Sequence, residues 1–409
     1  MTYKKKFLIS ISIISVFFIT LIDRLASFGR LFNDDTYFTS LLLLLCTTIL
    51  FSFVNLKLLR IVTDSYTRFL FYLWITILFL GFFRGVLIAE TYFDWKGILL
   101  SNLPFALSTF FIFIGFNITN IKFILGNYVR YVFLFGFFLI YLGLATNDQL
   151  YPRMMVPVCF LIVFIPYIKK KWGLLVLLVA IVSCLVSLGF RIHVIKVVIA
   201  LLIIILYYLK FIKTRIVNIF FILLIFTPLI LLTLGLNGDF NIFEFISSSN
   251  DFSYAVKNRG EYTNMNSDTR TFIYVEVLNS IDSIKELVFG NSMVSDYNSD
   301  FFDSADEFGV RKSSEVGALN ILMLYGLFGM VSFLLIIFRI SFLAIYDSNN
   351  NLSKMLGLVI AAKFITIFIE ENTKFDLNFC FFWLMVGLLS SAHFRSLSDA
   401  SIKNYFSKL

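Results

Sequence analysis

Three charged side chains in the second half of the sequence could together act on a phosphorylated substrate: Arg191, Arg270 and Glu315. A guanidinium group pairs bidentately with phosphate oxygens and stays charged at any relevant pH, so the two arginines could clamp a diphosphate. Glu315 could serve as a general base that takes a proton from an acceptor hydroxyl. Ser314 is predicted to cap the next helix and to place Glu315 in its first turn, where the helix dipole favours a carboxylate. Two of the three residues also have a structural interpretation, Glu315 as a capping glutamate and Arg191 as a packing arginine.

Other basic side chains fall inside apolar segments, where a charge is costly and marks either function or an internal ion pair. Arg84, His193 and Lys196 are candidate substrate-binding residues, with Arg84 expected to contact a lipid phosphate. Lys363 lies inside a further apolar segment. The structural alternatives are snorkelling or an internal ion pair for Arg84 and Lys363, and a satisfied, bundle-facing imidazole for His193.

No metal ion or cofactor is expected. The acidic run of Asp300, Asp303, Asp306 and Glu307 is irregularly spaced, which favours a solvated face over a divalent-cation site. The sequence contains no Gly-rich phosphate loop, nucleophile elbow or His/Cys cluster. All four cysteines fall within apolar segments, so they predict no disulfide framework.

The elements that must position these residues are apolar helices. A mean hydropathy of +0.89, with 59% hydrophobic and 15% charged residues, excludes an ordinary soluble domain. The chain is predicted to be an all-α, polytopic membrane protein with about twelve transmembrane helices, each needing about 20 apolar residues. The predicted cores are Phe7–Ile22, Tyr37–Leu56, Phe69–Ala89, Ile98–Phe116, Tyr131–Ala145, Met154–Ile168, Trp172–Phe190, Ile192–Leu209, Ile216–Gly235, Val316–Ile345, Met355–Ile369 and Leu377–Ala392.

One polar stretch, residues 236–315, divides the chain into helices 1–9 (1–235), a large loop (236–315) and helices 10–12 with a tail (316–409). The loop holds fourteen Asp and Glu against six Lys and Arg. Outside it, nineteen Lys and Arg fall on one set of alternate connections and six on the other. Because positive residues favour the cytoplasmic side, both termini are predicted to be cytoplasmic and the large loop external.

Two short helices are predicted inside the large loop. Thr269–Ile281 has apolar residues at helical spacing, with Asp268 as its N-cap. The second helix should begin at the capping box Ser283–Glu286 and stop at Gly290. The stretch Asn291–Lys312 offers little apolar surface, so it is predicted to be a mobile lid.

This layout resembles the O-antigen ligase/polymerase superfamily, most closely the Wzy-type O-antigen polymerases. The resemblance rests on the twelve spans, on an arginine just after the seventh span, and on a loop arginine some twenty residues before a glycine. It also rests on SSEVGALNILMLYGLFGM at 313–330, with the glycine pair Gly326 and Gly329. It covers roughly the second half of the chain. Ligases of the group show His-Asn where this chain has Ser-Glu at 314–315, which favours a polymerase, and Gly-Asn-Ser at 290–292 replaces the usual Gly-x-Gly.

The resemblance implies a GT-C-like bundle in the bacterial inner (cytoplasmic) membrane, with a periplasmic active site built from Arg191, Arg270 and Glu315. The implied activity is that of a metal-independent, inverting glycosyltransferase. It would move a growing glycan from undecaprenyl diphosphate onto a new lipid-linked repeat unit. The implied partners are this lipid-linked oligosaccharide, membrane lipid and a chain-length regulator protein, with no nucleic acid.

Two alternatives stay open. The first is a ligase that transfers the finished glycan to a lipid A core. The second is a lipid-linked oligosaccharide flippase or another transporter, which could also hold twelve spans and buried basic residues. Transporters usually show matching halves with broken helices at the membrane midplane, and the two halves of this sequence show no such match.

Overall fold

The computed structural model describes residues 3–26, 36–54, 59, 62, 64–132, 136, 138, 150–186, 191–213, 215–236, 255–258, 261–264, 271–298, 310–369 and 373–407. Within these residues the chain is predominantly helical, with two short antiparallel strand pairs, β1–β2 and β3–β4. The predicted all-α class is confirmed.

The elements run along the chain as follows. The first part holds α1 (Tyr3–Ala26), α2 (Thr36–Phe53), α3 (Ser65–Ile88), α4 (Tyr92–Gly97), η2 (Ile98–Asn102), α5 (Leu103–Ser108), α6 (Phe111–Gly115), α7 (Ile118–Asn127) and η3 (Tyr128–Val132). The middle part holds α9 (Leu150–Met155), α10 (Val158–Ile162), η4 (Ile165–Tyr167), α11 (Lys170–Val186), α12 (Arg191–Tyr208), η5 (Phe211–Lys213) and α13 (Arg215–Leu236). The loop segment holds β1 (Ala255–Asn258), β2 (Glu261–Asn264), α15 (Thr271–Asn279), α16 (Ile284–Phe289), η6 (Ser292–Val294), β3 (Tyr297–Asn298) and β4 (Val310–Arg311). The last part holds α17 (Gly317–Tyr346), α18 (Asn351–Ala361), α19 (Lys363–Ile369), α20 (Leu377–Ser390), α21 (Ala392–Ser396) and α22 (Asp399–Phe406).

Six helical stretches among the described residues are long and apolar enough to cross a membrane, which supports a multi-pass membrane protein. They are Tyr3–Ile22, Ser65–Ile88, Tyr92–Gly115, Arg191–Tyr208, Gly317–Tyr346 and Asn351–Ile369. Three shorter apolar helices accompany them: Ser40–Leu50, Arg215–Ile230 and Leu377–Ser390. Twelve spans therefore remain a prediction.

Two of the predicted spans show why the count differs. The predicted sixth span is not one helix, because Met154–Ile168 is broken into the end of α9, then α10 and η4. Pro157 lies at the first break and Pro166 in η4, just after the second, and proline lacks the amide donor that a continuous helix requires. Most of the predicted fifth span, Tyr131–Ala145, lies outside the described residues.

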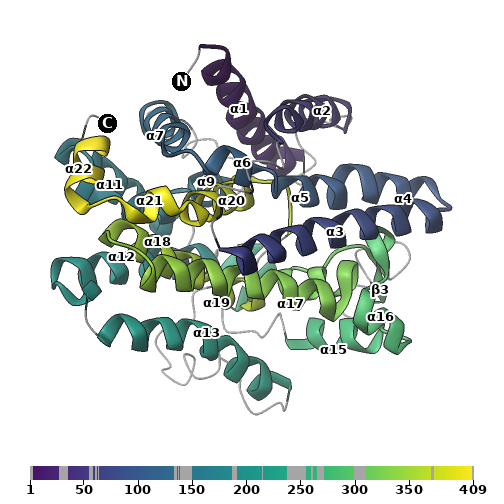
Figure 1. Cartoon of the computed structure of the whole chain (residues 1–409). Coiled ribbons are helices and arrows are strands. Elements are labelled where there is room, and N and C mark those ends of the chain that lie inside the picture. The colour runs from purple at the N-terminus through teal and green to yellow at the C-terminus, as the bar shows by residue number, and fades with distance from the viewer. Residues whose placement is uncertain are drawn as a thin grey trace.

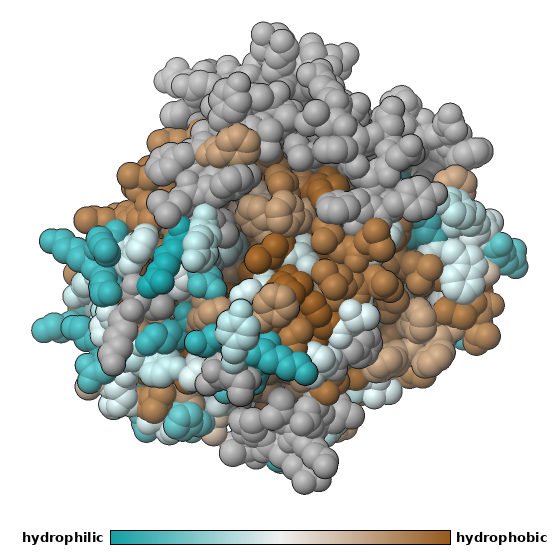
Figure 2. All heavy atoms as spheres, turned by 90° about the horizontal axis from the view of Figure 1, so that it is seen from above, coloured by the Kyte–Doolittle hydropathy of each residue, from teal (hydrophilic) through white to brown (hydrophobic). Residues whose placement is uncertain are grey.

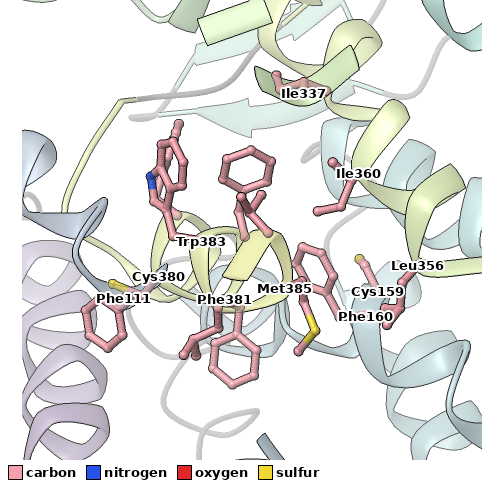
Figure 3. Packing of buried hydrophobic residues seen from close by; sticks show 14 of the residues in the cluster. Phe111, Cys159, Phe160, Ile337, Leu356, Ile360, Cys380, Phe381, Trp383 and Met385 are labelled. Atoms are coloured by element: carbon pink, nitrogen blue, oxygen red, sulfur yellow. The ribbon is translucent and has the colours of Figure 1, made fainter. Parts of the chain in front are cut away.

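The core of the bundle is organised around α20. Every residue of α20 is buried, as expected for a helix that is apolar on all sides. Figure 3 shows Trp383 and Phe381 leaving this helix in opposite directions, with Cys380 beside Phe111. α20 is therefore the central helix of the bundle, and the surrounding helices pack against it.

The bundle has two distinct ends. The end that carries α15, α16, η6 and the β3–β4 pair is called here the loop end; α21 and α22 lie at the opposite, tail end (Figure 1). Figure 2 shows apolar residues across the middle of one face, while hydrophilic residues gather at the tail end and, in smaller number, at the loop end. α3, α12 and α13 also expose many large apolar side chains. An apolar belt between two polar ends suits contact with membrane lipid.

Backbone contact between α16 and α17 positions the loop segment on the bundle. α16 begins where the hydroxyl of Ser283 accepts a hydrogen bond from the amide of Glu286 (3.2 Å) and ends at Gly290, which has a φ of 71°. This confirms the predicted second loop helix. α17 is kinked at Gly326, where φ is 68°. A Cβ atom there would lie 2.2 Å from the carbonyl oxygen of Val288, so only glycine fits.

Candidate functional site

Glu315 lies before α17 rather than inside it. The helix begins at Gly317 with Val316 as its N-cap residue, so the prediction that Ser314 caps the helix and that Glu315 occupies its first turn was wrong. The hydroxyl of Ser314 instead accepts a hydrogen bond from the amide of Val316 (2.9 Å) and closes a local turn. Glu315 therefore gains little from the dipole of α17, which acts mainly within the first turn.

The turn that carries Glu315 is held in place by Asn320, from the first turns of α17. The side-chain nitrogen of Asn320 donates to the carbonyl of Ser314, and its side-chain oxygen accepts from the Ser314 amide, both at 2.6 Å. Ser314 and Asn320 are buried, whereas Glu315 is half-buried. The carboxylate is therefore presented from a fixed backbone, which is the requirement for a positioned acid or base.

Further polar side chains surround this turn. Tyr297 of β3 pairs in register with Arg311 of β4. Burial raises the pKa of Tyr297 most strongly, the guanidinium of Arg311 opposes that rise, and the nearby carboxylates of Glu276 and Glu315 add to it. These four side chains, from α15, β3, β4 and the turn before α17, thus form one polar cluster at the loop end. Sequence reasoning missed Glu276, Tyr297 and Arg311 as site residues, and no local motif marks them.

A cavity of about 400 Å³ opens at the loop end, close to the turn that carries Glu315. Lys96, Lys312 and Lys374 line it, and Asp376 is the one carboxylate among the described lining residues, so we call it the lysine cavity. Its volume falls within the roughly 300–1,000 Å³ range of small-molecule sites. A smaller neighbouring hollow shares Lys312 and Lys374 with it and is also lined by Ser314. The basic cavity and the Glu315 turn are therefore adjacent.

The lysines of this cavity come from three segments far apart in the sequence. Lys96 is on α4, Lys312 directly follows β4, and Lys374 precedes α20. The ammonium group of Lys312 also forms a 2.8 Å ion pair with Asp94 of α4. Lys96 and Lys374 are among the six Lys and Arg on the connections that the sequence predicts to be external. That scarcity was the one available signal, and it could not show that the segments converge.

The predicted basic residues of α12 have separate surroundings. Arg191 is the first residue of this helix and is half-buried. Nε2 of His193 lies 2.8 Å from the hydroxyl of Ser183 in α11, which favours the packed, bundle-facing interpretation of this histidine. Nζ of Lys196 donates to the side-chain oxygen of Asn378 in the first turn of α20 (3.2 Å). Arg270, the loop arginine, lies outside the described residues.

Two other intramembrane cations pack against protein groups. Arg84 donates from Nη1 to the carbonyl of Phe289 and from Nη2 to the carbonyl of Gly290, both at 2.8 Å, and so binds the C-terminus of α16. This favours a structural role for Arg84 over contact with a lipid phosphate. Nζ of Lys363 lies 4.1 Å from the ring centroid of Phe379, a cation–π contact rather than snorkelling to the surface.

Among the described residues, no three or more His, Cys, Asp or Glu side chains gather in a way that could hold a metal ion. The acidic run between residues 300 and 307 lies outside those residues. Comparison with protein-family models, with curated proteins and with solved structures gave no match.

Proposed function

We propose that this chain is a membrane-embedded glycosyltransferase that polymerises lipid-linked oligosaccharide repeat units. The observation that carries the proposal is the adjacency, at the loop end, of a basic cavity and a rigidly held carboxylate. A phosphorylated amphiphile needs cationic groups for its head, and an acceptor hydroxyl needs a base nearby. Both lie at the end of an apolar bundle, where a lipid-anchored substrate would present its polar part.

In the proposed reaction, a hydroxyl of the acceptor sugar attacks the anomeric carbon of the donor glycan from the face opposite the diphosphate. A new glycosidic C–O bond forms while the bond between the anomeric carbon and the diphosphate oxygen breaks, which inverts the configuration. Glu315 accepts the hydroxyl proton. Arg191 and Arg270 offset the negative charge that develops on the departing undecaprenyl diphosphate.

The test is to replace Glu315→Gln, Arg191→Gln and Arg270→Gln singly in cells that depend on this gene, and to resolve the surface glycan by electrophoresis. Glutamine keeps the size of glutamate but cannot take a proton, and in place of either arginine it removes the positive charge. For each variant we therefore expect polymer ladders to collapse to a single repeat unit. Lys403→Gln, an exposed charge change on α22, is the matched control and should leave the ladder intact. Membrane levels of each variant are measured by immunoblot.

The pattern of loss discriminates between the activities. A single repeat attached to the lipid core indicates that polymerisation was lost. A bare core beside accumulated polymer on its lipid carrier would indicate a ligase and would overturn the polymerase proposal. Normal ladders from all three variants, at normal membrane levels, would overturn the assignment of these residues.

A further inference from the structure

The lysine cavity has the bipartite character of a site for a lipid head group. Lys96, Lys312 and Lys374 supply three ammonium groups, while Ile19 of α1 and Leu43 of α2 supply apolar wall. Lysine is a point-charge phosphate ligand that tolerates several binding geometries. A multiply charged phosphate group can thus be neutralised on one side of the cavity while the first units of a hydrocarbon chain pass along the other.

This cavity is built from different elements than the helix that carries Arg191. Its described lining residues come from α1, α2, α4, η2, Lys312 and residues 374–376, and none belongs to α12. The basic groups of the lysine cavity and Arg191 thus stand on separate elements. A transferase that joins two lipid-linked substrates must hold two diphosphates during each transfer, one on the donor and one on the acceptor.

We propose that the lysine cavity is the diphosphate site of the acceptor lipid, distinct from a donor site at Arg191. The inference rests on the proposed function, since only a reaction between two lipid-linked substrates requires two such sites. Ser314 adjoins both the Glu315 turn and the hollow next to the cavity, so an acceptor anchored at Lys312 and Lys374 starts beside the base. The ion pair with Asp94 orients the ammonium group of Lys312 at the cavity wall.

The first experiment counts bound lipid by native mass spectrometry of the full chain in detergent, with undecaprenyl diphosphate as the probe. The wild type is expected to bind two molecules. The double variant Lys312→Gln/Lys374→Gln should bind one, because each lost charge-assisted hydrogen bond lowers affinity by roughly 10-fold or more. Lys285→Gln is the matched control: it removes an exposed charge at the same end, on α16, and should still bind two.

Two further probes identify the ligand chemistry. Phosphatidylglycerol tests an ordinary phospholipid head group, and inorganic diphosphate tests the anion without a lipid chain. We expect neither to displace undecaprenyl diphosphate from the cavity at equal concentration. Displacement by phosphatidylglycerol would make the cavity a general phospholipid site, and displacement by inorganic diphosphate would show that the apolar wall contributes nothing; either result overturns the proposal.

Steady-state kinetics assigns the site to the acceptor. With a lipid-linked polymer as donor and a lipid-linked single repeat as acceptor, the double variant should raise the KM for the acceptor by at least about 10-fold. The KM for the donor should not change, and Lys312→Arg/Lys374→Arg should restore most of the acceptor affinity. A rise in the donor KM instead would overturn the assignment.

Failure of this inference and failure of the proposed function give different results. If the wild type binds one undecaprenyl diphosphate and the double variant also binds one, the acceptor site in the lysine cavity is contradicted. The proposed transferase then keeps only the donor site at Arg191. A wild type that binds none contradicts the proposed substrate itself. The melting temperature of each variant is measured first. If the double variant fails to fold, Lys312→Gln and Lys374→Gln are tested singly, and binding of two molecules at wild-type affinity by both would overturn the proposal.

Discussion

Arg84 illustrates how a residue that sequence reasoning assigned to substrate can be used by the fold. Both of its terminal nitrogens bind carbonyls at the end of α16. We predict that Arg84→Met and Arg84→Lys each increase amide hydrogen exchange across α16 and η6, because carbonyls at a helix C-terminus lose their partners and lysine cannot reach both. Unchanged exchange in Arg84→Lys would instead favour a simple requirement for positive charge, as in phosphate binding.

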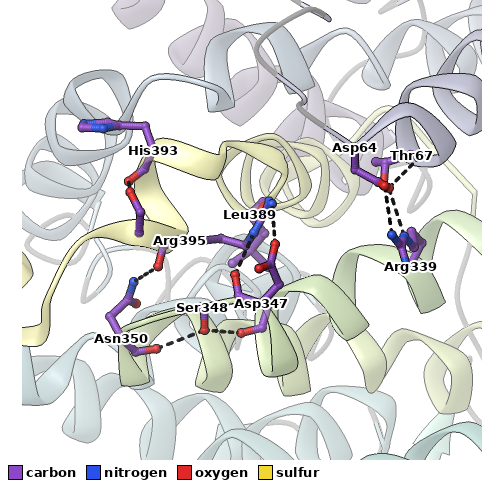
Figure 4. A network of polar contacts seen from close by, with 11 residues as sticks. Asp64, Thr67, Arg339, Asp347, Ser348, Asn350, Leu389, His393 and Arg395 are labelled. Carbon is purple, nitrogen blue, oxygen red and sulfur yellow. Dashed lines mark hydrogen bonds and ion pairs between the residues drawn. The ribbon is translucent and has the colours of Figure 1, made fainter.

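At the tail end, Asp64 supplies a prediction about pH. Asp64 is the N-cap of α3 and binds Arg339 of α17 through Arg339 Nε (3.0 Å) and Nη2 (3.0 Å), as Figure 4 shows. Burial would raise the pKa of Asp64, but hydrogen bonds from Arg339 and Thr67 outweigh it and lower the pKa from 3.8 to about 2. The ionised carboxylate thus stabilises the folded state above its unfolded pKa, and this contribution is lost as the pH falls from about 5 toward 2.

We predict that Asp64→Asn loses roughly 1–2 kcal/mol of stability at pH 7 and flattens the fall in melting temperature between pH 5 and pH 3. Asparagine is as good an N-cap as aspartate, so the substitution removes the charge and retains the cap. Arg339→Gln should flatten the same part of the curve. Thermal unfolding in detergent measures both, and curves parallel to the wild type would contradict the prediction.

The chemistry of single residues was easier to predict from the sequence than their neighbours were. Glu315 stands out because a carboxylate ends a polar stretch at the start of an apolar helix. The residues around Glu315 do not stand out in the sequence. Asn320 binds Ser314, six residues earlier, and Lys96 and Lys374 come from distant segments. Convergence of distant segments is a property of packing, and a single sequence carries no local signal for it.

At the scale of elements, Gly290 at the end of α16 and Gly326 in α17 let the backbones of the two helices come into direct contact. Gly326→Ala would place a Cβ atom 2.2 Å from the Val288 carbonyl oxygen, and Gly290→Ala would place one 2.5 Å from the amide nitrogen of Tyr325. Both glycines also have positive φ, where alanine is strained. We predict that each substitution costs more than about 2 kcal/mol of stability and detaches α16 from the bundle.

Gly97→Ala is the matched control for these two substitutions, because its new Cβ atom would meet only Lys312 Cδ at 3.7 Å, an ordinary contact. Since Gly97 is helical, alanine there should be neutral or slightly stabilising. Melting temperatures in detergent, together with proteolysis of the loop segment, check the set. Equal melting temperatures for all three variants would show that the α16–α17 contact is not required.

Elements were predictable where the signal is local. α15 falls within the predicted Thr269–Ile281, and α16 starts directly after its predicted cap Ser283, because helix periodicity and capping depend on residues only three or four apart. The predicted mobile lid was wrong for residues 291–298. There Met293 and Tyr297 are buried, and Asn102 of η2 donates to the Met293 carbonyl (2.8 Å). A segment poor in apolar residues can still be anchored by two of them when the bundle supplies the partners.

At the scale of the molecule, composition was enough to predict a helical membrane bundle but not the number of crossings. A window of apolar residues does not distinguish a lipid-spanning helix from a helix buried in the bundle. α20 shows the difficulty, because it is apolar and buried along its whole length and yet is shorter than the six candidate spans. Packing against neighbours, rather than hydropathy, makes this helix central.

The orientation of the bundle is a prediction about the whole molecule, and the two polar ends allow a direct test. Lys285 on α16 and Lys403 on α22 are both exposed and lie at the loop end and the tail end. Because the excess of lysine and arginine predicts that both termini are cytoplasmic, a membrane-impermeant maleimide should label Lys285→Cys in cells whose inner membrane is intact. Lys403→Cys should be labelled only after that membrane is opened.

The wild-type chain, treated with the same maleimide, is the control for the four native cysteines, of which Cys46, Cys159 and Cys380 are buried. We expect it to remain unlabelled. The reverse labelling pattern would place the loop end in the cytoplasm, where a lipid-linked glycan already moved to the external face could not reach the lysine cavity.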